Sequence, residues 1–176
     1  MHLSIRPYPS YLVPPEGGDT RFANLYLALE ALLESTRKRM VGLKAVHSWE
    51  QSRRNSGSRS ATDEEKLRAP PVTHPLVRTH PETGRQALYL GNHTSHIEGV
   101  PVAEGRELLA ELLEHATQPI FVYRHRWQPG NLATWQPGDL VMWDDRCLVH
   151  SASDDFDFLV YPRVLHRTVI HGSSLV

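Results

Sequence analysis

Two apolar segments with helical periodicity, set among short strand-like segments, constrain the fold of this 176-residue chain most. The first runs from Phe22 to Val41 and is ended by Gly42, and the second runs from Val102 to Thr117. Their leucines recur three and four residues apart: Leu25, Leu29, Leu32 and Leu33 in the first, and Leu108, Leu109, Leu112 and Leu113 in the second. Both segments are therefore predicted to be helices with one buried face.

The remaining segments have the composition of strands and turns. Residues Pro75–Thr79 and Gln86–Gly91 flank a glycine-containing turn at 80–85, which predicts a β-hairpin. Further strands are predicted at Leu43–Trp49, Ile120–Trp127, Asp139–Trp143 and Arg163–His171. Residues 1–20 predict loops with at most one short strand, and the polar residues 50–70 predict a loop or lid. Together these elements predict an α+β protein built around a β-sandwich or jelly roll.

Length, charge and cysteine content limit the class of protein. A chain of this length suits one domain, so residues 1–176 are predicted to form a single domain with a real core. The net charge of −1 gives no support for binding nucleic acid or a membrane surface, and no apolar run is long enough for a membrane helix. Because Cys147 is the only cysteine and the first residues do not resemble a signal peptide, we expect a cytoplasmic protein. The oligomeric state stays open, a homo-oligomer included.

Arg163 and Arg167 lie four residues apart in a predicted strand. On a strand both side chains would point to the same face, about 13 Å apart at ~3.3 Å per residue. Guanidinium groups on a partly apolar wall are costly unless anions meet them, and each can hold a carboxylate through two parallel hydrogen bonds. The spacing suggests one site for a dicarboxylate and one for an acidic substrate. The alternative is a pair of surface arginines on an edge strand.

His150 follows the predicted strand 139–143 and a short turn. Neutral imidazole is a good ligand for iron, zinc and copper, so His150 is a candidate metal ligand. The alternative is a polar histidine that hydrogen-bonds within the protein. For His93 and His96 we favour hydrogen-bonding loop residues over metal ligands, and for Cys147 a small buried residue.

Three motifs in this chain resemble those of the taurine/2,4-dichlorophenoxyacetate dioxygenase family. They are Pro14-Pro-Glu-Gly-Gly-Asp-Thr20, the segment His74–Arg85, and the run Trp135-Gln-Pro-Gly-Asp-Leu-Val-Met-Trp-Asp-Asp-Arg146 followed by His150, Arg163 and Arg167. The segment Val102–Thr117 is similar to the phenoxyacetate branch. The resemblance runs over nearly the whole chain and covers about the last two-thirds of a family domain.

The resemblance implies a double-stranded β-helix, a jelly roll like that of clavaminate synthase, with flanking helices and incomplete at its N-terminus. It implies an enzyme that uses Fe(II), 2-oxoglutarate and O2 to hydroxylate a small anionic organic substrate, aryloxyacetate-like or taurine-like. By resemblance, His150 matches an iron ligand, and Thr20 and Arg163 match the residues that hold 2-oxoglutarate. Arg167 matches the arginine that binds the carboxylate or sulfonate of the substrate, and Asp145 stands where the family usually has Asn.

The family's other two iron ligands form a His-x-Asp pair, which is not intact in this chain. In one alignment His2 takes the Asp position, and in the other His2 is the histidine and Ser4 takes the Asp position. Three explanations follow: a truncated or mispredicted gene product, a metal-poor pseudoenzyme, or a site where an anion replaces the carboxylate. The alternative function is thus a catalytically inactive member or fragment that binds small anions or a partner. Asp19 or Asp155 within reach of His150 would favour the enzyme.

Overall fold

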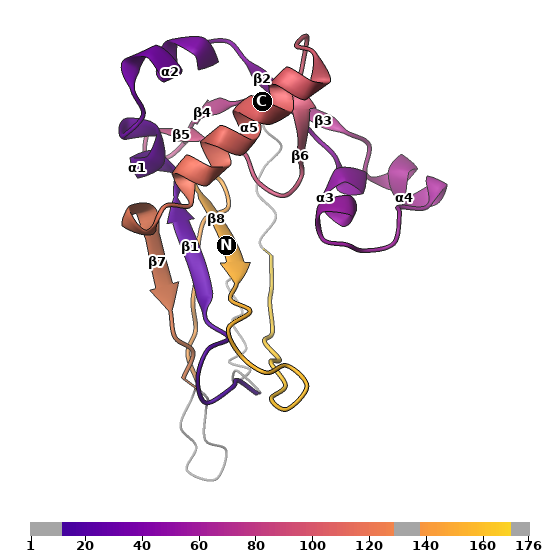
Figure 1. Cartoon of the computed structure of the whole chain (residues 1–176), viewed down its shortest axis with the longest axis vertical. Coiled ribbons are helices and arrows are strands. Elements are labelled where there is room, and N and C mark those ends of the chain that lie inside the picture. Colours follow the sequence, from indigo (N-terminus) through magenta and orange to yellow (C-terminus); the bar gives the residue numbers. More distant parts are fainter. Residues whose placement is uncertain (1–11, 129–137, 170–176) are drawn as a thin grey trace. The chain divides into compact units, whose positions relative to one another are not determined.

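The computed structural model describes residues 12–128 and 138–169 (Figure 1). The chain divides into two compact units, and each is described by itself. Unit 1 comprises residues 1–21, 124–143 and 151–176, and unit 2 comprises residues 22–123 and 144–150.

Helices and antiparallel strands make the described chain α+β, as predicted. The helices are α1 (Leu25–Glu30), α2 (Glu34–Met40), α3 (Trp49–Asn55), α4 (Asp63–Arg68), α5 (Val102–Ala116) and the 3₁₀ helix η1 (Pro119–Phe121). The strands are β1 (Thr20–Asn24), β2 (Lys44–His47), β3 (Val72–Pro75), β4 (Val77–Thr79), β5 (Gln86–Leu88), β6 (Thr94–Ile97), β7 (Val122–His125) and β8 (Leu148–Ala152). They form three sheets, with strand orders β7-β1-β8, β3-β2-β6 and β4-β5.

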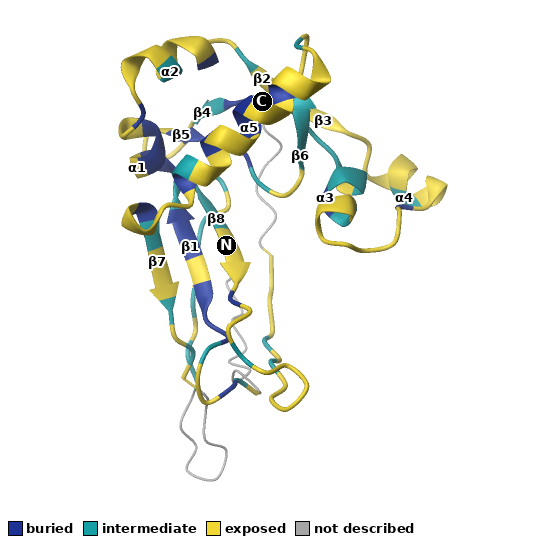
Figure 2. Cartoon of the chain, viewed as in Figure 1, coloured by how far each residue is buried: buried dark blue, intermediate teal, exposed yellow. Residues whose placement is uncertain are grey.

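The core of unit 2 forms where α1 and α5 pack on strands β5 and β6. Leu88, Ile97 and Leu112 are fully buried, and Leu25 is only 1% exposed. Figure 2 shows buried residues in α1, α5 and β5, whereas β6 is mostly of intermediate burial. The predicted face of the second helix is confirmed for its residues Leu108, Leu109, Leu112 and Ala116, which are all buried. Burial of these apolar side chains is the main force that stabilises the unit.

The prediction of one helix from Phe22 to Val41 was wrong. The segment starts as strand β1, and Asn24 then ends the strand and begins α1, since its Oδ1 accepts hydrogen bonds from the backbone N–H groups of Tyr26 and Leu27. The chain leaves the helical conformation after Glu30, and α2 begins only at Glu34. Asparagine favours the cap position over the helix interior, which explains why leucine spacing alone misplaced the boundary.

Residues 50–70 are not the continuous loop that their polarity predicted. They contain most of α3 and all of α4. Thr62 and Glu65 form a capping box, in which the threonine side chain accepts from the N–H of Glu65 and the glutamate accepts from the N–H of Thr62. This box is a helix-start signal that can be read from sequence, and it was overlooked.

The strand predictions were right in part. The β4-β5 hairpin is confirmed, with Val77 opposite Leu88. The described residues 139–143 form no strand, and within 163–169 a single bridge joins Val164 to Leu12. Residues 170 and 171 of the last predicted strand lie outside the described residues. Strand β8, which carries His150, was not predicted, nor was β6.

In the described part of the chain, no helix is both long and apolar enough to cross a membrane. The longest, α5, has 15 residues.

Gly105 sets how closely α5 approaches β6, and its replacement tests this packing. A Cβ at this position would lie 3.1 Å from the backbone nitrogen of Ile97 and 3.3 Å from its Cβ. Alanine gains about 1 kcal/mol over glycine in an exposed helix interior. At Gly105, overpacking against a buried strand should outweigh that gain, so we expect Gly105→Ala to lower the free energy of unfolding by about 1–2 kcal/mol.

Urea denaturation measures this change. Ala110 is exposed on the same helix, and Ala110→Gly is the matched control, with an expected loss of about 1 kcal/mol from helix propensity alone. An unchanged or higher free energy of unfolding for Gly105→Ala would show that the strand shifts to make room.

Candidate functional site

Thr20 and Arg163, which the sequence predicts to bind a cosubstrate, are in direct contact in unit 1. Arg163 donates from Nη2 to the Thr20 hydroxyl at 3.0 Å and from Nε to the Gly18 carbonyl at 2.6 Å. Gly18 has a φ of +66°, and a Cβ there would lie 2.5 Å from Pro14 Cγ and 3.3 Å from Arg163 Cδ. Glycine therefore permits both the turn before β1 and the close approach of the arginine side chain.

The Thr20 hydroxyl is left with a proton to donate. Its oxygen accepts from Arg163 and also from the indole Nε1 of Trp127 at 2.9 Å. A hydroxyl has two acceptor lone pairs and one donor proton, so two incoming donors direct its own proton to a third group. None of the described residues accepts that proton in a hydrogen bond.

Arg163 is a partly buried cation without a carboxylate partner among the residues that the structure describes. Burial lowers the pKa of its guanidinium, and the negative charge of Asp19 opposes that shift. Only two of the five N–H donors of a guanidinium are used by Gly18 and Thr20. Since an unpaired, partly buried charge is unfavourable, the remaining donors together with the Thr20 proton make this pair a candidate receptor for an anion. We call Thr20 and Arg163 the anion receptor.

A second cluster of charges lies beside the receptor, also in unit 1. Arg124 donates from Nε to the carboxylate of Asp19 and from Nη2 to the carboxylate of Asp155. Asp19 is only 4% exposed, and Asp155 also accepts from the N–H of Gly18 at 3.2 Å. Sequence reasoning considered both aspartates as metal ligands, whereas in the structure both are paired with Arg124.

Arg167 is exposed and forms no hydrogen bond or ion pair with another described residue. Its predicted place on the same strand face as Arg163 was wrong, because residues 163–169 form only the Val164 bridge. Its role in binding the substrate stays a prediction.

His150 lies on β8, in unit 2. Its Nδ1 is 3.4 Å from Oδ1 of Asp145, and its ring lies 6.1 Å from the ring of Phe22. A metal-bound histidine usually donates its other ring N–H to a carboxylate or carbonyl, and Asp145 is the carboxylate within ion-pair distance of Nδ1. The role of His150 as a metal ligand stays a prediction. The positions of the other two predicted ligands, at His2 or Ser4, lie outside the described residues.

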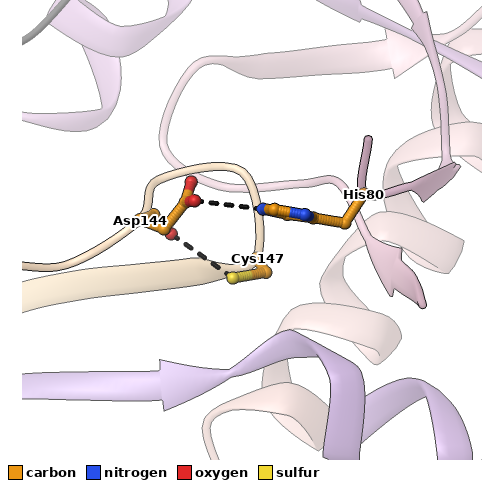
Figure 3. Close-up of side chains that lie close together, drawn as sticks. All are labelled: His80, Asp144 and Cys147. Carbon is orange, nitrogen blue, oxygen red and sulfur yellow. Dashed lines mark hydrogen bonds and ion pairs between the residues drawn. The ribbon is translucent and has the colours of Figure 1, made fainter. Parts of the chain in front are cut away.

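Another group in unit 2 has the composition of a metal site. Donor atoms of His80, Asp144 and Cys147 lie within 4.8 Å of one another, and no other such group is found in the described residues (Figure 3). The backbone N–H groups of Glu82 and Thr83 both donate to His80 Nδ1 at 3.3 Å. The ring proton therefore lies on Nε2, which donates to Asp144 at 3.0 Å.

This arrangement leaves the group without a good metal ligand. Both ring nitrogens of His80 are engaged, and burial raises the pKa of the Cys147 thiol, which favours the protonated form. Arg146 binds Asp144 through Nε and Nη2, and this guanidinium holds the pKa of the carboxyl well below its usual range. We interpret the group as a hydrogen-bonded structural cluster.

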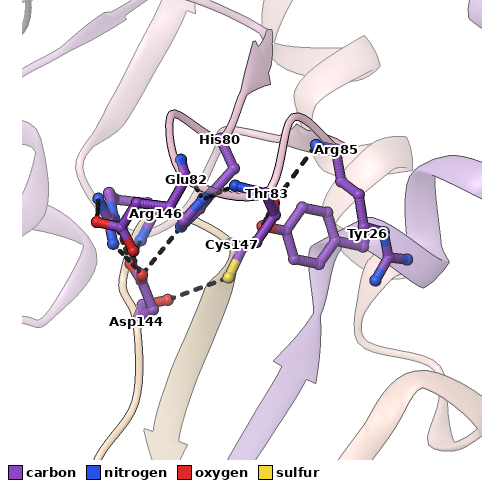
Figure 4. Close-up of polar contacts among 8 residues, drawn as sticks. All are labelled: Tyr26, His80, Glu82, Thr83, Arg85, Asp144, Arg146 and Cys147. Atoms are coloured by element: carbon purple, nitrogen blue, oxygen red, sulfur yellow. Dashed lines mark hydrogen bonds and ion pairs between the residues drawn. The ribbon is translucent and has the colours of Figure 1, made fainter.

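The cluster fastens the turn before β8 to the β4-β5 hairpin (Figure 4). Arg146 donates from Nη1 to Glu82 at 3.2 Å, and His80 joins the hairpin turn to Asp144. The carbonyl of Cys147 accepts from the N–H of Leu25, where α1 begins. This network positions the start of the strand that carries His150. Sequence reasoning missed it because the hairpin turn and residues 144–147 are about sixty residues apart.

Two histidines and a tyrosine lie close together on the sheet β3-β2-β6 and next to it. The rings of His47 and His74 are 5.4 Å apart, and Tyr89 lies 5.0 Å from His47. The Nε2 of His47 is buried and has no hydrogen-bond partner among the described residues. Burial lowers the pKa of His47 to about 4, and the charges of His74, His93 and Arg78 act in the same direction.

The chain belongs to the taurine catabolism dioxygenase TauD, TfdA family, whose model matches residues 11–169. The family predicted from the sequence is thereby confirmed. Over 139 residues the chain is 50% identical to the alpha-ketoglutarate-dependent 2,4-dichlorophenoxyacetate dioxygenase of Burkholderia sp. (strain RASC), covering 79% of this chain and 44% of that protein. Over 152 residues it is 39% identical to the (S)-phenoxypropionate/alpha-ketoglutarate-dioxygenase of Sphingobium herbicidovorans, covering 83% and 50%.

Among solved structures, the chain is similar to the crystal structure of AAD-2 in complex with Mn(II) and N-oxalylglycine. The TM-score is 0.72 at 43% identity, and the match covers 82% of this chain and 54% of that one. The chain thus spans about half the length of the proteins it matches.

Replacing His80 tests the structural interpretation of its cluster. His80→Phe leaves two backbone N–H groups and an Asp144 oxygen without their partner, so we expect the free energy of unfolding to fall by about 1–3 kcal/mol. The matched control is His93→Phe at an exposed position, with an expected change within about 0.5 kcal/mol. Thermal unfolding with and without Zn(II) is the second measurement. A stabilisation by zinc that His80→Phe abolishes would contradict our interpretation.

The stability of the protein should depend on pH through His47. In the folded state its pKa is about 4, whereas an unfolded histidine titrates near 6.5. Below about pH 6.5 the unfolded chain binds the proton more readily, so stability falls as the pH drops from about 6.5 towards 4. Urea titrations across this range should show a shallower slope for His47→Phe than for the wild type. Equal slopes would show that His47 does not cause this dependence.

Proposed function

We propose that this chain carries the cosubstrate-binding and substrate-binding part of an Fe(II)- and 2-oxoglutarate-dependent dioxygenase that acts on a small carboxylate. The anion receptor carries the proposal: Arg163 is partly buried without a carboxylate partner in the described residues, and the Thr20 hydroxyl, which accepts two hydrogen bonds, can donate its proton to a ligand. We further propose that the two units belong to one jelly-roll domain of a cytoplasmic protein.

The receptor suits one end of a dicarboxylate such as 2-oxoglutarate. Arg163 can donate two parallel hydrogen bonds to a carboxylate, and the Thr20 hydroxyl can add a third. The hydrogen bonds from Arg163 to Gly18 and Thr20 hold the guanidinium in one orientation before the anion arrives. Such preorganisation lowers the entropic cost of binding.

The described residues supply one imidazole of the 2-His-1-carboxylate set that iron uses in such enzymes. His150 would hold Fe(II) through Nε2, and Asp145 would accept the proton of Nδ1 and so fix the ring's tautomer. Bound Fe(II) would supply the activation of O2 that is coupled to oxidation of 2-oxoglutarate. The His80–Asp144–Arg146 cluster would keep the strand of His150 in place.

An aryloxyacetate is the substrate class that we propose, in line with the substrates for which the relatives are named. Arg167 is exposed and has no described partner, so its guanidinium is available to bind the substrate's carboxylate. Hydroxylation of the carbon next to the ether oxygen would give a hemiacetal, which collapses to a phenol and glyoxylate.

The second candidate is an inactive family member that binds small anions without turnover. The receptor needs no metal for its hydrogen bonds, and the His-x-Asp pair of the family is not intact at residues 2–4. In this second candidate, Thr20 and Arg163 still bind an anion, but no substrate is oxidised.

Anaerobic titration with Fe(II) and 2-oxoglutarate tests the proposal. The visible charge-transfer band of the chelate should appear and saturate in the wild type, and succinate should form when O2 and 2,4-dichlorophenoxyacetate are added. Arg163→Gln should raise the Kd of 2-oxoglutarate about 10- to 100-fold, the value of lost charge-assisted hydrogen bonds. Arg167→Gln is the matched variant. It should weaken the binding of 2,4-dichlorophenoxyacetate and leave the Kd of 2-oxoglutarate unchanged.

The outcomes separate the two candidates. Binding of 2-oxoglutarate that depends on Arg163, without a band and without succinate, would favour the inactive binding protein. A folded protein that binds no 2-oxoglutarate would contradict both.

A further inference from the structure

Asp19 is a buried carboxylate directly beside the anion receptor. It precedes Thr20 in the chain, it is 4% exposed, and its charge acts on the guanidinium of Arg163. A negative charge at this place opposes the receptor in two ways. It repels an incoming carboxylate, and it can itself bind Arg163 and so occupy the donors that the ligand needs.

Arg124 removes this conflict in the structure. It binds Asp19 through Nε and Asp155 through Nη2, so one guanidinium joins two carboxylates. Arg163 is not within ion-pair distance of Asp19 or of any other carboxylate in the described residues. Among the described residues, the other cation within ion-pair distance of Asp19 is Arg126, which lies 3.9 Å away with a side chain that is 84% exposed. Solvent screens such an exposed pair, so Arg126 contributes little.

We propose that Arg124 is a positioning residue that keeps the anion receptor open by holding the charge of Asp19 away from Arg163. The identity of the ligand, 2-oxoglutarate, rests on the proposed function. The pairing of Asp19 with Arg124 rather than with Arg163 rests on the described contacts. Without Arg124, the buried carboxylate of Asp19 would lose its main partner. The charge of Asp19 already acts on Arg163, which is therefore the cation that Asp19 would bind instead. The receptor would then close on the protein's own carboxylate.

A purely structural role for Arg124 predicts something different. Arg124 also joins the segment before β1 to the segment after β8, because Asp19 and Asp155 lie on these two segments. If this tether were its whole contribution, removing Asp19 as well would not restore binding. If Arg124 acts by neutralising Asp19, removing both charges should restore it.

Four variants decide between these roles: Arg124→Gln, Asp19→Asn, the double variant Arg124→Gln/Asp19→Asn, and the control Arg126→Gln. The Kd of 2-oxoglutarate is measured by isothermal titration calorimetry in buffer containing Mn(II). We expect Arg124→Gln to raise the Kd about tenfold or more, and the double variant to return it to within about threefold of the wild type. Arg126→Gln should leave the Kd unchanged, since its contact with Asp19 is long and exposed. A double variant as weak as Arg124→Gln would overturn the proposal.

A second measurement needs no ligand and so separates this inference from the proposed function. A double-mutant cycle on the unfolding equilibrium, with Asp19→Asn and Arg163→Gln, measures the coupling between these two side chains. With Arg124 present, we expect the coupling to change the equilibrium constant of unfolding by less than about twofold. In the Arg124→Gln background, we expect a factor of about ten or more. Equal coupling in both backgrounds would overturn the inference. Suppose that the coupling between Asp19 and Arg163 is larger in the Arg124→Gln background, but the wild type binds no 2-oxoglutarate. This result would support the proposed role of Arg124 and contradict the proposed function.

Discussion

The pairing of buried charge is the constraint on which the rest of this structure depends. An ion removed from water must be compensated by an opposite charge or by hydrogen bonds, and the compensation must come from well-placed groups. Asp19 meets this requirement through Arg124, and Asp144 meets it through Arg146 and His80. Each of these pairings joins parts of the chain that are distant in sequence or stiffens a turn next to a predicted functional residue.

Arg163 is one of the partly buried arginines without an ion-pair partner among the described residues, and unlike Arg53 and Arg78 it does not lie over an aromatic ring. Its guanidinium is partly buried and hydrogen-bonded to Gly18 and Thr20, yet it has no carboxylate partner there. A protein tolerates such a group where a ligand completes it, and this is the physical argument for the anion receptor that we propose. The same reasoning separates it from the His80 cluster, in which every member already has a partner and nothing is left for a metal.

The sequence predicted the features that depend on local pattern or on a family motif. Helical periodicity placed α5, and the glycine-containing turn placed the β4-β5 hairpin. The motif resemblance selected Thr20 and Arg163, which the structure brings into contact although 143 positions separate them. Leucine spacing misplaced the first helix, because it carries no information on the side-chain cap that Asn24 provides. The ion pairs of Asp19 and Asp144 could not be predicted from the sequence, since no local pattern indicates which arginine a carboxylate will bind.

The anion receptor and the predicted metal ligand belong to different units of the chain. Thr20 and Arg163, the anion receptor, are joined by a hydrogen bond within unit 1, whereas His150 belongs to unit 2, where its Nδ1 lies 3.4 Å from Oδ1 of Asp145. Substitutions at residues 2–4 that abolish metal binding do not touch any hydrogen bond described in the receptor. Under the proposed function, loss of the metal ligands would end the oxidation reaction and leave the hydrogen bonds of the anion receptor in place. The two candidate functions, the enzyme and the anion-binding protein, therefore use the same anion receptor. They differ in whether the chain holds a metal.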